Sequence, residues 1–337
     1  LVFCDNYLRK LNKLNQNIIN YDLRSNKMNW KFVVIGDKKT PKNFKLKFGD
    51  YYSFQDQKKL NFKFSKICPP NSYARKNIGY LISFLENDII IETDDDNFPK
   101  KNFFLKRSNI QEVKKIENKS WINIYKIFNK NKEVVWPRGL PLDEINSNKI
   151  QISKKKKFGQ FNLQQGLADV NPDVDAIFRI ISKKINIRFK DLKINIGKSL
   201  TTFNSQNTTW FKNIFPLMYL PVTCPMRCTD IWRSLVVLKI MRTNNQNVLF
   251  FGTDMYQKRN GHNLLNDFEQ EIKLYLYDKA IFKLLDQLKL KVGKKFYLRN
   301  LKICYSALIA HKFIDKSELN YLNAWIYDCK KLFFIKK

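Results

Sequence analysis

The stretch Ile89-Ile90-Ile91-Glu92-Thr93-Asp94-Asp95-Asp96 decides the fold. Its three consecutive isoleucines are β-branched and apolar, which is typical of a short buried strand, and three carboxylates follow directly. In open α/β sheets, ligands bind beyond the carboxyl ends of the strands. Adjacent carboxylates need a compensating cation if all of them are to stay ionised. The sequence therefore predicts a site for Mg²⁺ or Mn²⁺ that substrate phosphates complete, and a solvated acidic turn is the alternative.

Strand and helix patterns alternate on either side of this stretch. Residues 30–36 predict an earlier strand, and apolar residues between 78 and 85 recur at helical spacing. A helix between two strands normally makes them parallel. We therefore expect an α/β fold with a mixed, mostly parallel, Rossmann-like sheet flanked by helices. A catalytic domain is predicted over residues 1–240, and a mainly helical C-terminal region over residues 241–337.

Charge and composition narrow the class of protein. The 337 residues carry a net charge of +32, but Lys is spread along nearly the whole chain together with abundant Asn and Ile. A nucleic-acid-binding protein would gather its charge on one face, so we expect no specific nucleic-acid partner. A Lys-rich surface favours peripheral contact with an anionic membrane. No apolar run approaches the roughly 18 residues of a spanning helix, and a cytoplasmic location is expected.

Six segments carry a family resemblance when they are taken in order. They are residues 33–41, 75–80, 91–97, 136–141, 169–179 and 259–265. Together they resemble the STELLO glycosyltransferase family and, more distantly, the reversibly glycosylated polypeptides of nucleotide-sugar metabolism. The resemblance implies a GT-A-like fold and metal-dependent transfer of a hexosyl or pentosyl group. The implied donor is a nucleotide sugar, with UDP-sugars favoured, and the implied acceptor is a glycan or a lipid-linked glycan.

The resemblance also assigns metal-binding roles. In the GT-A pattern, the first carboxylate of an Asp-x-Asp contacts the ribose or the hydrated metal, and the last ligates the metal directly. These positions are Asp94 and Asp96 here, with Asp95 between them facing the sugar or a neighbouring donor group. His262 is the candidate third metal ligand, and a packed or capping histidine is the alternative. A divalent metal would stabilise negative charge on the leaving diphosphate.

Three other segments are expected to contact the nucleotide-sugar donor. Arg75 begins a helix, and its planar fork suits a diphosphate, with Lys76 or Asn77 as a secondary contact. Arg138, in the Trp-Pro-Arg-Gly loop, is a candidate for the diphosphate or the acceptor. The residues that close the first predicted strand, where GT-A enzymes hold the nucleobase and ribose, are Gly36, Asp37 and Thr40.

The catalytic base is the hardest residue to identify. An inverting transfer needs a carboxylate within hydrogen-bond reach of the acceptor hydroxyl. Asp230 is the leading candidate because it lies where a turn-rich segment meets an apolar helix. A helix N-cap role is the alternative, since Asp is favoured there. Asp254 and Asp169 are weaker candidates, and retention without a dedicated base stays open.

Two other functions stay open at this point. A nucleotide-sugar mutase or a self-glycosylating protein would need no separate acceptor. A basic nucleic-acid-binding or scaffold protein would use the positive charge, and its binding would depend steeply on salt. That function gives no reason for an acidic cluster at the end of a strand, so it ranks last.

Overall fold

The computed structural model describes residues 2–4, 30–41, 43–46, 49–131, 133–146, 149–182, 184–259, 261 and 263–334. Its strands are β1 (Val2–Cys4), β2 (Val33–Ile35), β3 (Asp50–Tyr52), β4 (Ile89–Thr93), β5 (Asn97–Pro99), β6 (Ile110–Lys115), β7 (Lys157–Gln160), β8 (Leu163–Asp169), β9 (Lys193–Asn195), β10 (Asn207–Phe211) and β11 (Val248–Gln257).

The α-helices are α2 (Phe54–Lys59), α3 (Lys63–Ile67), α4 (Lys76–Ser83), α5 (Ile124–Phe128), α6 (Ala176–Ile181), α7 (Thr229–Thr243), α8 (Leu264–Gln287), α9 (Tyr297–Ala310) and α10 (Glu318–Phe334). Short 3₁₀ helices connect some of these elements. They are η1 (Tyr73–Arg75), η2 (Lys101–Phe104), η3 (Leu142–Glu144), η4 (Lys212–Met218), η5 (Met226–Cys228) and η6 (Lys294–Phe296).

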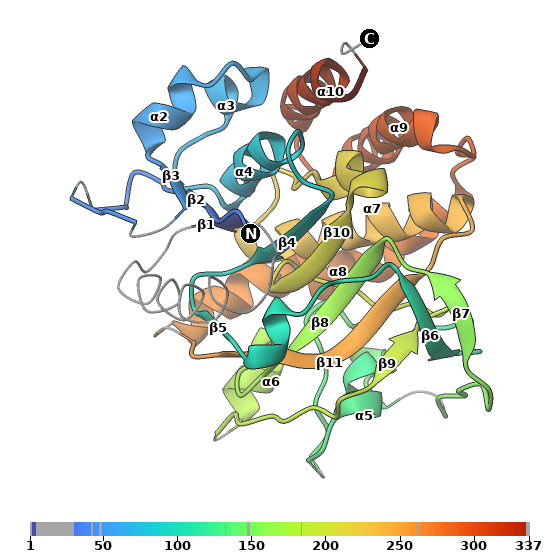
Figure 1. Cartoon of the computed structure of the whole chain (residues 1–337). Coiled ribbons are helices and arrows are strands. Elements are labelled where there is room, and N and C mark those ends of the chain that lie inside the picture. The colour runs from blue at the N-terminus through green and yellow to red at the C-terminus, as the bar shows by residue number, and fades with distance from the viewer. Residues whose placement is uncertain are drawn as a thin grey trace.

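One mixed sheet runs through the molecule in the order β3-β2-β1-β4-β10-β8-β11-β9-β6-β7, and β5 pairs with β11 off this path. Helices flank the sheet, with α8 passing behind it in the view of Figure 1. Strands β3, β2, β1 and β4 are parallel neighbours. Strand β10 runs antiparallel between β4 and β8. The mixed α/β architecture confirms the predicted fold class, although antiparallel pairs have a larger share than expected.

The parallel strands place the candidate site. The segment predicted as the first strand is β2, and β1 is an additional strand that pairs with both β2 and β4. Three residues of β1 are too few for the alternation of side chains to reveal a strand. Because β2 and β4 are both parallel to β1, their carboxyl ends lie at the same edge of the sheet. The turn after β2 and the acidic stretch after β4 therefore share that edge.

The C-terminal helices pack on the N-terminal half of the chain. Trp325 of α10 lies with its ring centroid 5.6 Å from that of Phe84, just after α4, and 6.4 Å from that of Phe64 in α3. Helix α7 is buried along nearly all of its length. A helix that is buried all round belongs to the interior of a large core. The helices and the sheet therefore share a hydrophobic core.

The predicted C-terminal region, residues 241–337, includes a strand of the sheet near its start. Strand β11 lies between β8 and β9, so a boundary after residue 240 would separate it from the strands with which it pairs. Helices dominate from Leu264 onward. A strand whose hydrogen-bonding partners precede it by tens of residues cannot be assigned to a domain from local pattern alone. Within the described ranges, no helix has both the length and the apolar character that crossing a membrane requires.

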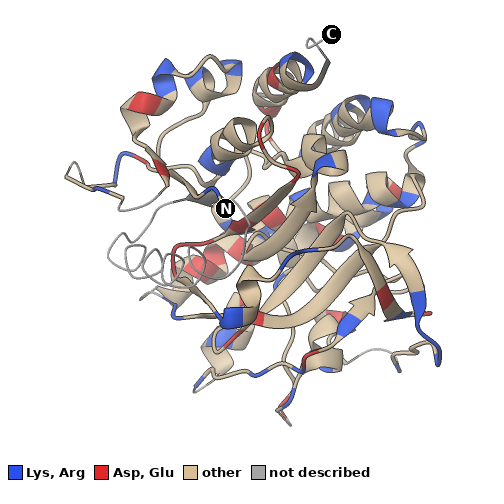
Figure 2. Ribbon diagram, in the orientation of Figure 1, with Lys and Arg blue, Asp and Glu red and all other residues tan. Residues whose placement is uncertain are grey.

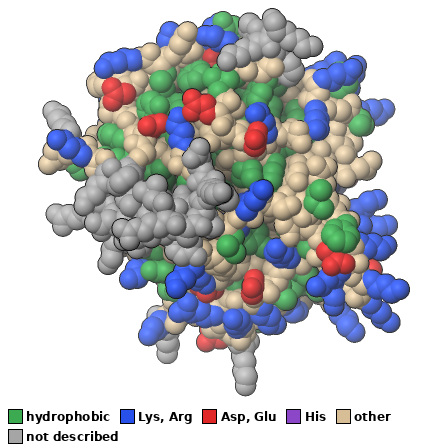
Figure 3. All heavy atoms as spheres, viewed as in Figure 1, with side chains coloured by type: hydrophobic (Ala, Val, Ile, Leu, Met, Phe, Trp, Pro, Cys, Tyr) green, Lys and Arg blue, Asp and Glu red, His purple; other side chains and the backbone are tan. Residues whose placement is uncertain are grey.

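Charges of the two signs are distributed differently. Lys and Arg occur in nearly every part of the ribbon, whereas Asp and Glu gather between the end of β4 and the first part of α8 (Figure 2). On the face shown in Figure 3, basic side chains lie mainly around the rim. The acidic concentration therefore coincides with the predicted site, and the basic charge on this face forms no single patch.

Candidate active site

The three carboxylates form a tight turn at the carboxyl end of β4. The N–H of Asn97 donates to the Asp94 carbonyl oxygen at 3.2 Å, and β5 begins at once. Asp95 and Asp96 are buried, whereas the side chain of Asp94 is 27% exposed. A solvated acidic turn would expose all three side chains, so this alternative does not describe the site.

A buried lysine compensates the charge of Asp94. The Lys76 ammonium donates to Asp94 Oδ1 at 2.6 Å and to the Tyr73 hydroxyl at 2.8 Å. The Tyr73 hydroxyl itself donates to Asp94 Oδ1 at 2.9 Å. Because both bonds reach Oδ1, the second oxygen of the carboxylate accepts neither of them. Lys76, expected only as a secondary contact, thus forms an ion pair with the first acid of the turn.

Asp96 is held from the opposite side by the end of β11. The side-chain amide of Gln257 donates to Asp96 Oδ1 at 2.9 Å, and the backbone N–H of Lys258 donates to the Asp96 carbonyl oxygen at 3.0 Å. Strands β5 and β11 pair here, with Gln257 opposite Asn97. This pairing brings Arg259, the next residue along, toward the acidic turn.

The turn fits one kind of metal site. Among the described residues, no three or more His, Cys, Asp or Glu side chains are grouped so that they could hold a metal ion. His262, the candidate third ligand, lies outside the described residues. Mg²⁺ is commonly bound through one or two carboxylates together with substrate phosphates. Asp94 and Asp96 fit that arrangement, in which the substrate completes the shell, better than a cage made by the protein alone.

Arg75 and Asn77, which were predicted to contact the donor, lie inside the fold. The Arg75 guanidinium is buried and donates to Gln57 Oε1 and, at 3.0 Å, to the Cys68 carbonyl oxygen. The Asn77 side chain exchanges two hydrogen bonds of 2.8 Å with the backbone of Leu220. Since these groups are used within the protein, neither side chain presents its donors to a diphosphate.

The residues after β2 form a compact turn at the same edge. The N–H of Asp37 bonds to Thr40 Oγ1 at 2.9 Å, and the N–H of Thr40 bonds back to the Asp37 carbonyl oxygen at 3.0 Å. Asp37 Oδ2 accepts from the N–H of Ser72 at 3.2 Å, which ties this turn to the approach of α4. A Cβ at Gly36 would lie 2.5 Å from the Tyr51 hydroxyl. The structure thus places the predicted nucleoside-binding residues beside the segment that carries Lys76.

Arg138 bridges two carboxylates and is itself buried. Its Nη1 and Nη2 donate to the two oxygens of Asp230 at 3.0 Å each. Its Nε and Nη2 donate to the two oxygens of Asp173 at 2.9 and 2.7 Å. A planar guanidinium with both edges engaged has little left to offer a substrate. The contact of Arg138 with the diphosphate or the acceptor therefore stays a prediction, and both of its edges are occupied in the structure.

Asp230 lies in the first turn of α7 rather than at its N-cap. Burial favours the neutral acid, but the Arg138 guanidinium outweighs it and holds the pKa of Asp230 below its usual value. The backbone N–H and the hydroxyl of Ser205 also donate to Asp230, at 3.1 and 3.2 Å. The Ser205 hydroxyl in turn meets Tyr73, which contacts Asp94. A buried carboxylate with four donors and a lowered pKa does not fit a general base, because such a base works best near the operating pH.

The two weaker candidates for the base are also paired with cations. Asp169 accepts from the Lys100 ammonium at 2.7 Å and from the backbone N–H of Phe189 at 2.9 Å. Asp254 accepts from Arg107 and, at 2.6 Å, from the Asn207 side chain. Both carboxylates are buried. The structure therefore brings none of the three acids forward as an available base.

A buried ion pair beneath the acidic turn was missed by sequence reasoning. Glu92 of β4 accepts from Arg233 of α7 at 2.7 and 3.0 Å, and both side chains are fully buried. Trp210 and Tyr80 also donate to Glu92. The sequence held a signal for this pair, because Glu92 and Arg233 are each a single charged residue within an apolar run. Charges that are buried in this way are almost always paired. This pair joins α7 to the strand that ends in the acidic turn.

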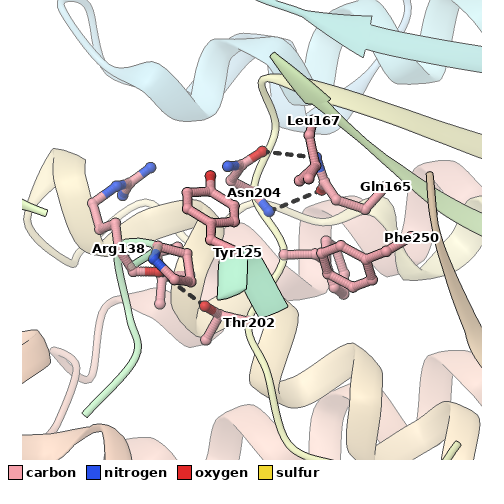
Figure 4. A pocket seen from close by; sticks show the side chains of 10 residues that line it. Tyr125, Arg138, Gln165, Leu167, Thr202, Asn204 and Phe250 are labelled. Carbon is pink, nitrogen blue, oxygen red and sulfur yellow. Dashed lines mark hydrogen bonds between the residues drawn. The ribbon is translucent and has the colours of Figure 1, made fainter. Parts of the chain in front are cut away.

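A small cavity lies beside the Arg138 bridge. Tyr125, Arg138, Gln165, Asn204 and Phe250 are among the residues that line it (Figure 4). The Gln165 amide donates to Asn204 Oδ1 at 3.1 Å, and the Asn204 backbone N–H donates to Gln165 Oε1 at 3.1 Å. The cavity therefore combines aromatic walls with polar groups that are already hydrogen-bonded to one another.

Comparison with known proteins finds similarity to one family of glycosyltransferases. A family model described as STELLO glycosyltransferases matches residues 227–336. The probable glycosyltransferase STELLO2 of Arabidopsis thaliana is 28% identical over 226 residues, which cover 61% of this chain and 29% of that protein. The probable glycosyltransferase STELLO1 of the same plant is 28% identical over 228 residues, with the same coverage of 61% and 29%. The chain thus spans less than a third of the length of these relatives. The chain is therefore similar to STELLO glycosyltransferases, and the family model matches its C-terminal third.

Proposed function

We propose that this chain is a metal-dependent glycosyltransferase that moves a sugar from a nucleotide-sugar donor to a glycan or lipid-linked acceptor. One observation carries the proposal. A turn of three acids, two of them buried, lies at the carboxyl end of β4, and a buried lysine contacts its most exposed member. Ligands of α/β sheets bind at this edge. A site that is acidic and yet supplied with cations suits a divalent metal with an anionic substrate.

The proposal assigns a role to the two outer aspartates of the turn and to the two side chains that bond to them. A bound Mg²⁺ or Mn²⁺ would act as a Lewis acid on the leaving diphosphate. Asp94 and Asp96 would ligate the metal, and Lys76 and Gln257 would fix the orientation of these two carboxylates. Partners of this kind matter because they set the direction of the ligating oxygens.

The nucleoside has a place at the same edge. The turn that Asp37 and Thr40 form after β2 would receive the nucleobase and ribose of a UDP-sugar. The acceptor would then approach from the side of the sheet that carries β8 and β11. Because Asp230 is tied to Arg138 and Ser205, we propose it as a positioning residue that supports Tyr73 and Asp94.

The test is donor turnover with a panel of UDP-sugars in the presence of Mn²⁺, followed as released UDP. Asp94→Asn and Asp96→Asn are each expected to lower turnover by about 100-fold or more. A metal supplies several kcal/mol of transition-state stabilisation, and each 1.4 kcal/mol or so is a factor of ten. Asp88→Asn is the matched control, because Asp88 is an exposed acid that precedes the same strand.

Unchanged turnover and unchanged metal dependence in Asp96→Asn would contradict the proposal. Mass spectrometry of the protein after incubation without an acceptor separates transfer to another molecule from self-glycosylation. The anomeric configuration of the product, read by NMR, distinguishes inversion from retention. Inversion would require a base other than the three paired aspartates, whereas retention would not.

A further inference from the structure

Three arginines lie on segments that meet at the first two turns of α8. Arg227 and Arg259 contact acids of this helix, and Glu271 Oε2 also accepts from the backbone N–H of Ala176 at 2.8 Å, at the start of the helix that carries Arg179. Arg179 lies in α6, Arg227 in η5, and Arg259 just after β11. Asp267, in the first turn of α8, accepts from Arg259 and lies 3.8 Å from Arg227 Nη1. Arg227 Nε also donates to Glu271, one turn further along α8.

Arg179 has no carboxylate partner of its own. Its side chain is only 6% exposed, and its Nη2 and Nη1 donate to the Pro172 carbonyl oxygen at 2.8 Å and to Asn171 Oδ1 at 3.4 Å. Within the described part of the chain, no ion pair joins Arg179 to an acid. Its Nε is buried without a hydrogen-bond partner, and so is Nη2 of Arg227. A buried cation that lacks an anion is costly, because desolvation is not repaid.

The neighbouring cations make this cost larger. Burial and the charges of Arg259 and Arg227 lower the pKa of Arg179 to about 9. The pKa of Arg259 is lowered as well, first by burial and then by Arg227. An anion placed among the three side chains would offset the repulsion between the cations and raise the pKa of each guanidinium. Arg179 thus stays a buried cation without an ion-pair partner among the described residues, whereas Arg227 and Arg259 share the carboxylates of Asp267 and Glu271.

The cluster lies close to the site already described. Arg259 follows Lys258 and Gln257, the two residues that hold Asp96. The negative charges of Asp96 and Asp173 both act on Arg259, and Asp173 is one of the two carboxylates that Arg138 bridges. Asp267, which pairs with Arg259, lies in the first turn of α8. A ligand bound at Asp94 and Asp96 would therefore have cations within reach on the side of α8.

We propose that Arg179, Arg227 and Arg259 form a binding site for a phosphate or diphosphate group. Guanidinium groups bind phosphate oxygens in planar, charge-assisted pairs, and two unpartnered N–H groups are already present here. The inference rests on the proposed function only in assigning the anion to the donor, whose diphosphate gains negative charge as the sugar leaves. A phosphorylated acceptor would offer the same chemistry.

The test uses inorganic pyrophosphate titrated into the whole chain with EDTA present, followed by calorimetry and thermal shift. Binding by the native protein, at least tenfold weaker in Arg179→Met, is the expected result. Arg299→Met is the matched control, because Arg299 is exposed on α9 and its loss removes the same charge. Its pyrophosphate affinity is expected to stay within twofold of that of the native protein. Equal affinity for the native protein and Arg179→Met, or no binding at all, overturns the proposal.

Stability gives a second readout that a purely structural arginine would not produce. Without an anion, Arg179→Met should melt at a higher temperature than the native protein, because it removes an uncompensated buried charge. A lower melting temperature together with unchanged pyrophosphate affinity would assign Arg179 to the fold alone. If Arg179→Met does not fold, Arg179→Lys takes its place in the test. This variant keeps the positive charge but lacks the planar guanidinium, so it should bind pyrophosphate more weakly than the native protein.

Competition assigns the source of the anion. If UDP displaces pyrophosphate from the native protein, the site belongs to the donor. If a glycosyl phosphate displaces it and UDP does not, the phosphate comes from the acceptor. Both outcomes support an anion site. Neither depends on sugar transfer, so failure of the turnover assay would leave the pyrophosphate result standing.

Discussion

Substitution of Arg233 tests how much the buried ion pair between Glu92 and Arg233 contributes to the stability of the fold next to the acidic turn. The Arg233→Met variant removes the cation from a fully buried pair in which two guanidinium nitrogens lie 2.7 and 3.0 Å from the oxygens of Glu92. Glu92 would then remain buried with only neutral donors from Trp210 and Tyr80. Breaking one partner out of a buried pair typically costs about 3–5 kcal/mol, because the other charge stays desolvated.

The magnitude is large against the stability of a folded domain. Typical free energies of unfolding are about 5–15 kcal/mol, so a loss of this size would be plain in urea denaturation followed by circular dichroism. Lys31→Met is the control, because Lys31 makes an ion pair with Glu86 at the same 2.7 Å on the surface. Exposed pairs contribute little, since water and salt screen them.

A double variant separates the pair from other effects of the substitution. Adding Glu92→Gln to Arg233→Met removes the orphaned charge and should recover a good part of the lost stability. The reasoning is refuted if Arg233→Met loses no more stability than Lys31→Met, or if the double variant is less stable than Arg233→Met alone. Because Glu92 lies two residues before Asp94, turnover should fall along with stability.

Three further predictions concern the surroundings of the site. Lys76→Met should lower turnover by about 10- to 100-fold in steady-state assays, because Asp94 loses its orienting partner, while Lys58→Met on the exposed face of α2 should not. Gly139→Ala should destabilise the protein by about 1–3 kcal/mol in urea titrations, because a Cβ there would lie 2.5 Å from Ile231 Cγ2 at a φ of +82°. Gly261→Ala should not, because no atom of the described residues lies within 4 Å of a Cβ at that position. Burial raises the pKa of Asp175 from 3.8 to about 6, so the folded state binds its proton more tightly than the unfolded state. Stability from this group is complete below pH 3.8 or so and is lost as the pH rises through about 6. Asp175→Asn should flatten this part of the pH profile, and an unchanged slope would contradict the assignment.

Much of the candidate site could be predicted from the sequence. The isoleucine run with its three aspartates is a local pattern, so the strand, the turn and the acidic cluster were all predicted at the right residues. The turn at Asp37 and Thr40 was found for the same reason. The mixed α/β class followed from the order of strand and helix patterns, which depends on neighbouring residues alone. Metal binding and the roles of the carboxylates stay predictions.

The roles of the cations could not be predicted in the same way. Arg75 and Lys76 are adjacent in sequence, and their types favour the arginine for a diphosphate. In the structure Arg75 is bound by Gln57 and Cys68, and it is Lys76 that contacts Asp94. Arg75 and Lys76 lie on different sides of the segment formed by η1 and α4. The packing of this segment against the rest of the protein decides which side faces the site, and a local sequence pattern does not contain that information.

The sequence by itself determined where the acidic turn lies and that it follows a buried strand. Both features are recognised from the order of apolar and acidic residues that are adjacent along the chain. Only the tertiary structure decided which charges meet. Arg138 with Asp230 and Glu92 with Arg233 pair across 92 and 141 residues, and Arg179 is left without an acid among the described residues. Such pairings depend on how distant segments pack, since the strength of an ion pair is set by separation and burial in space.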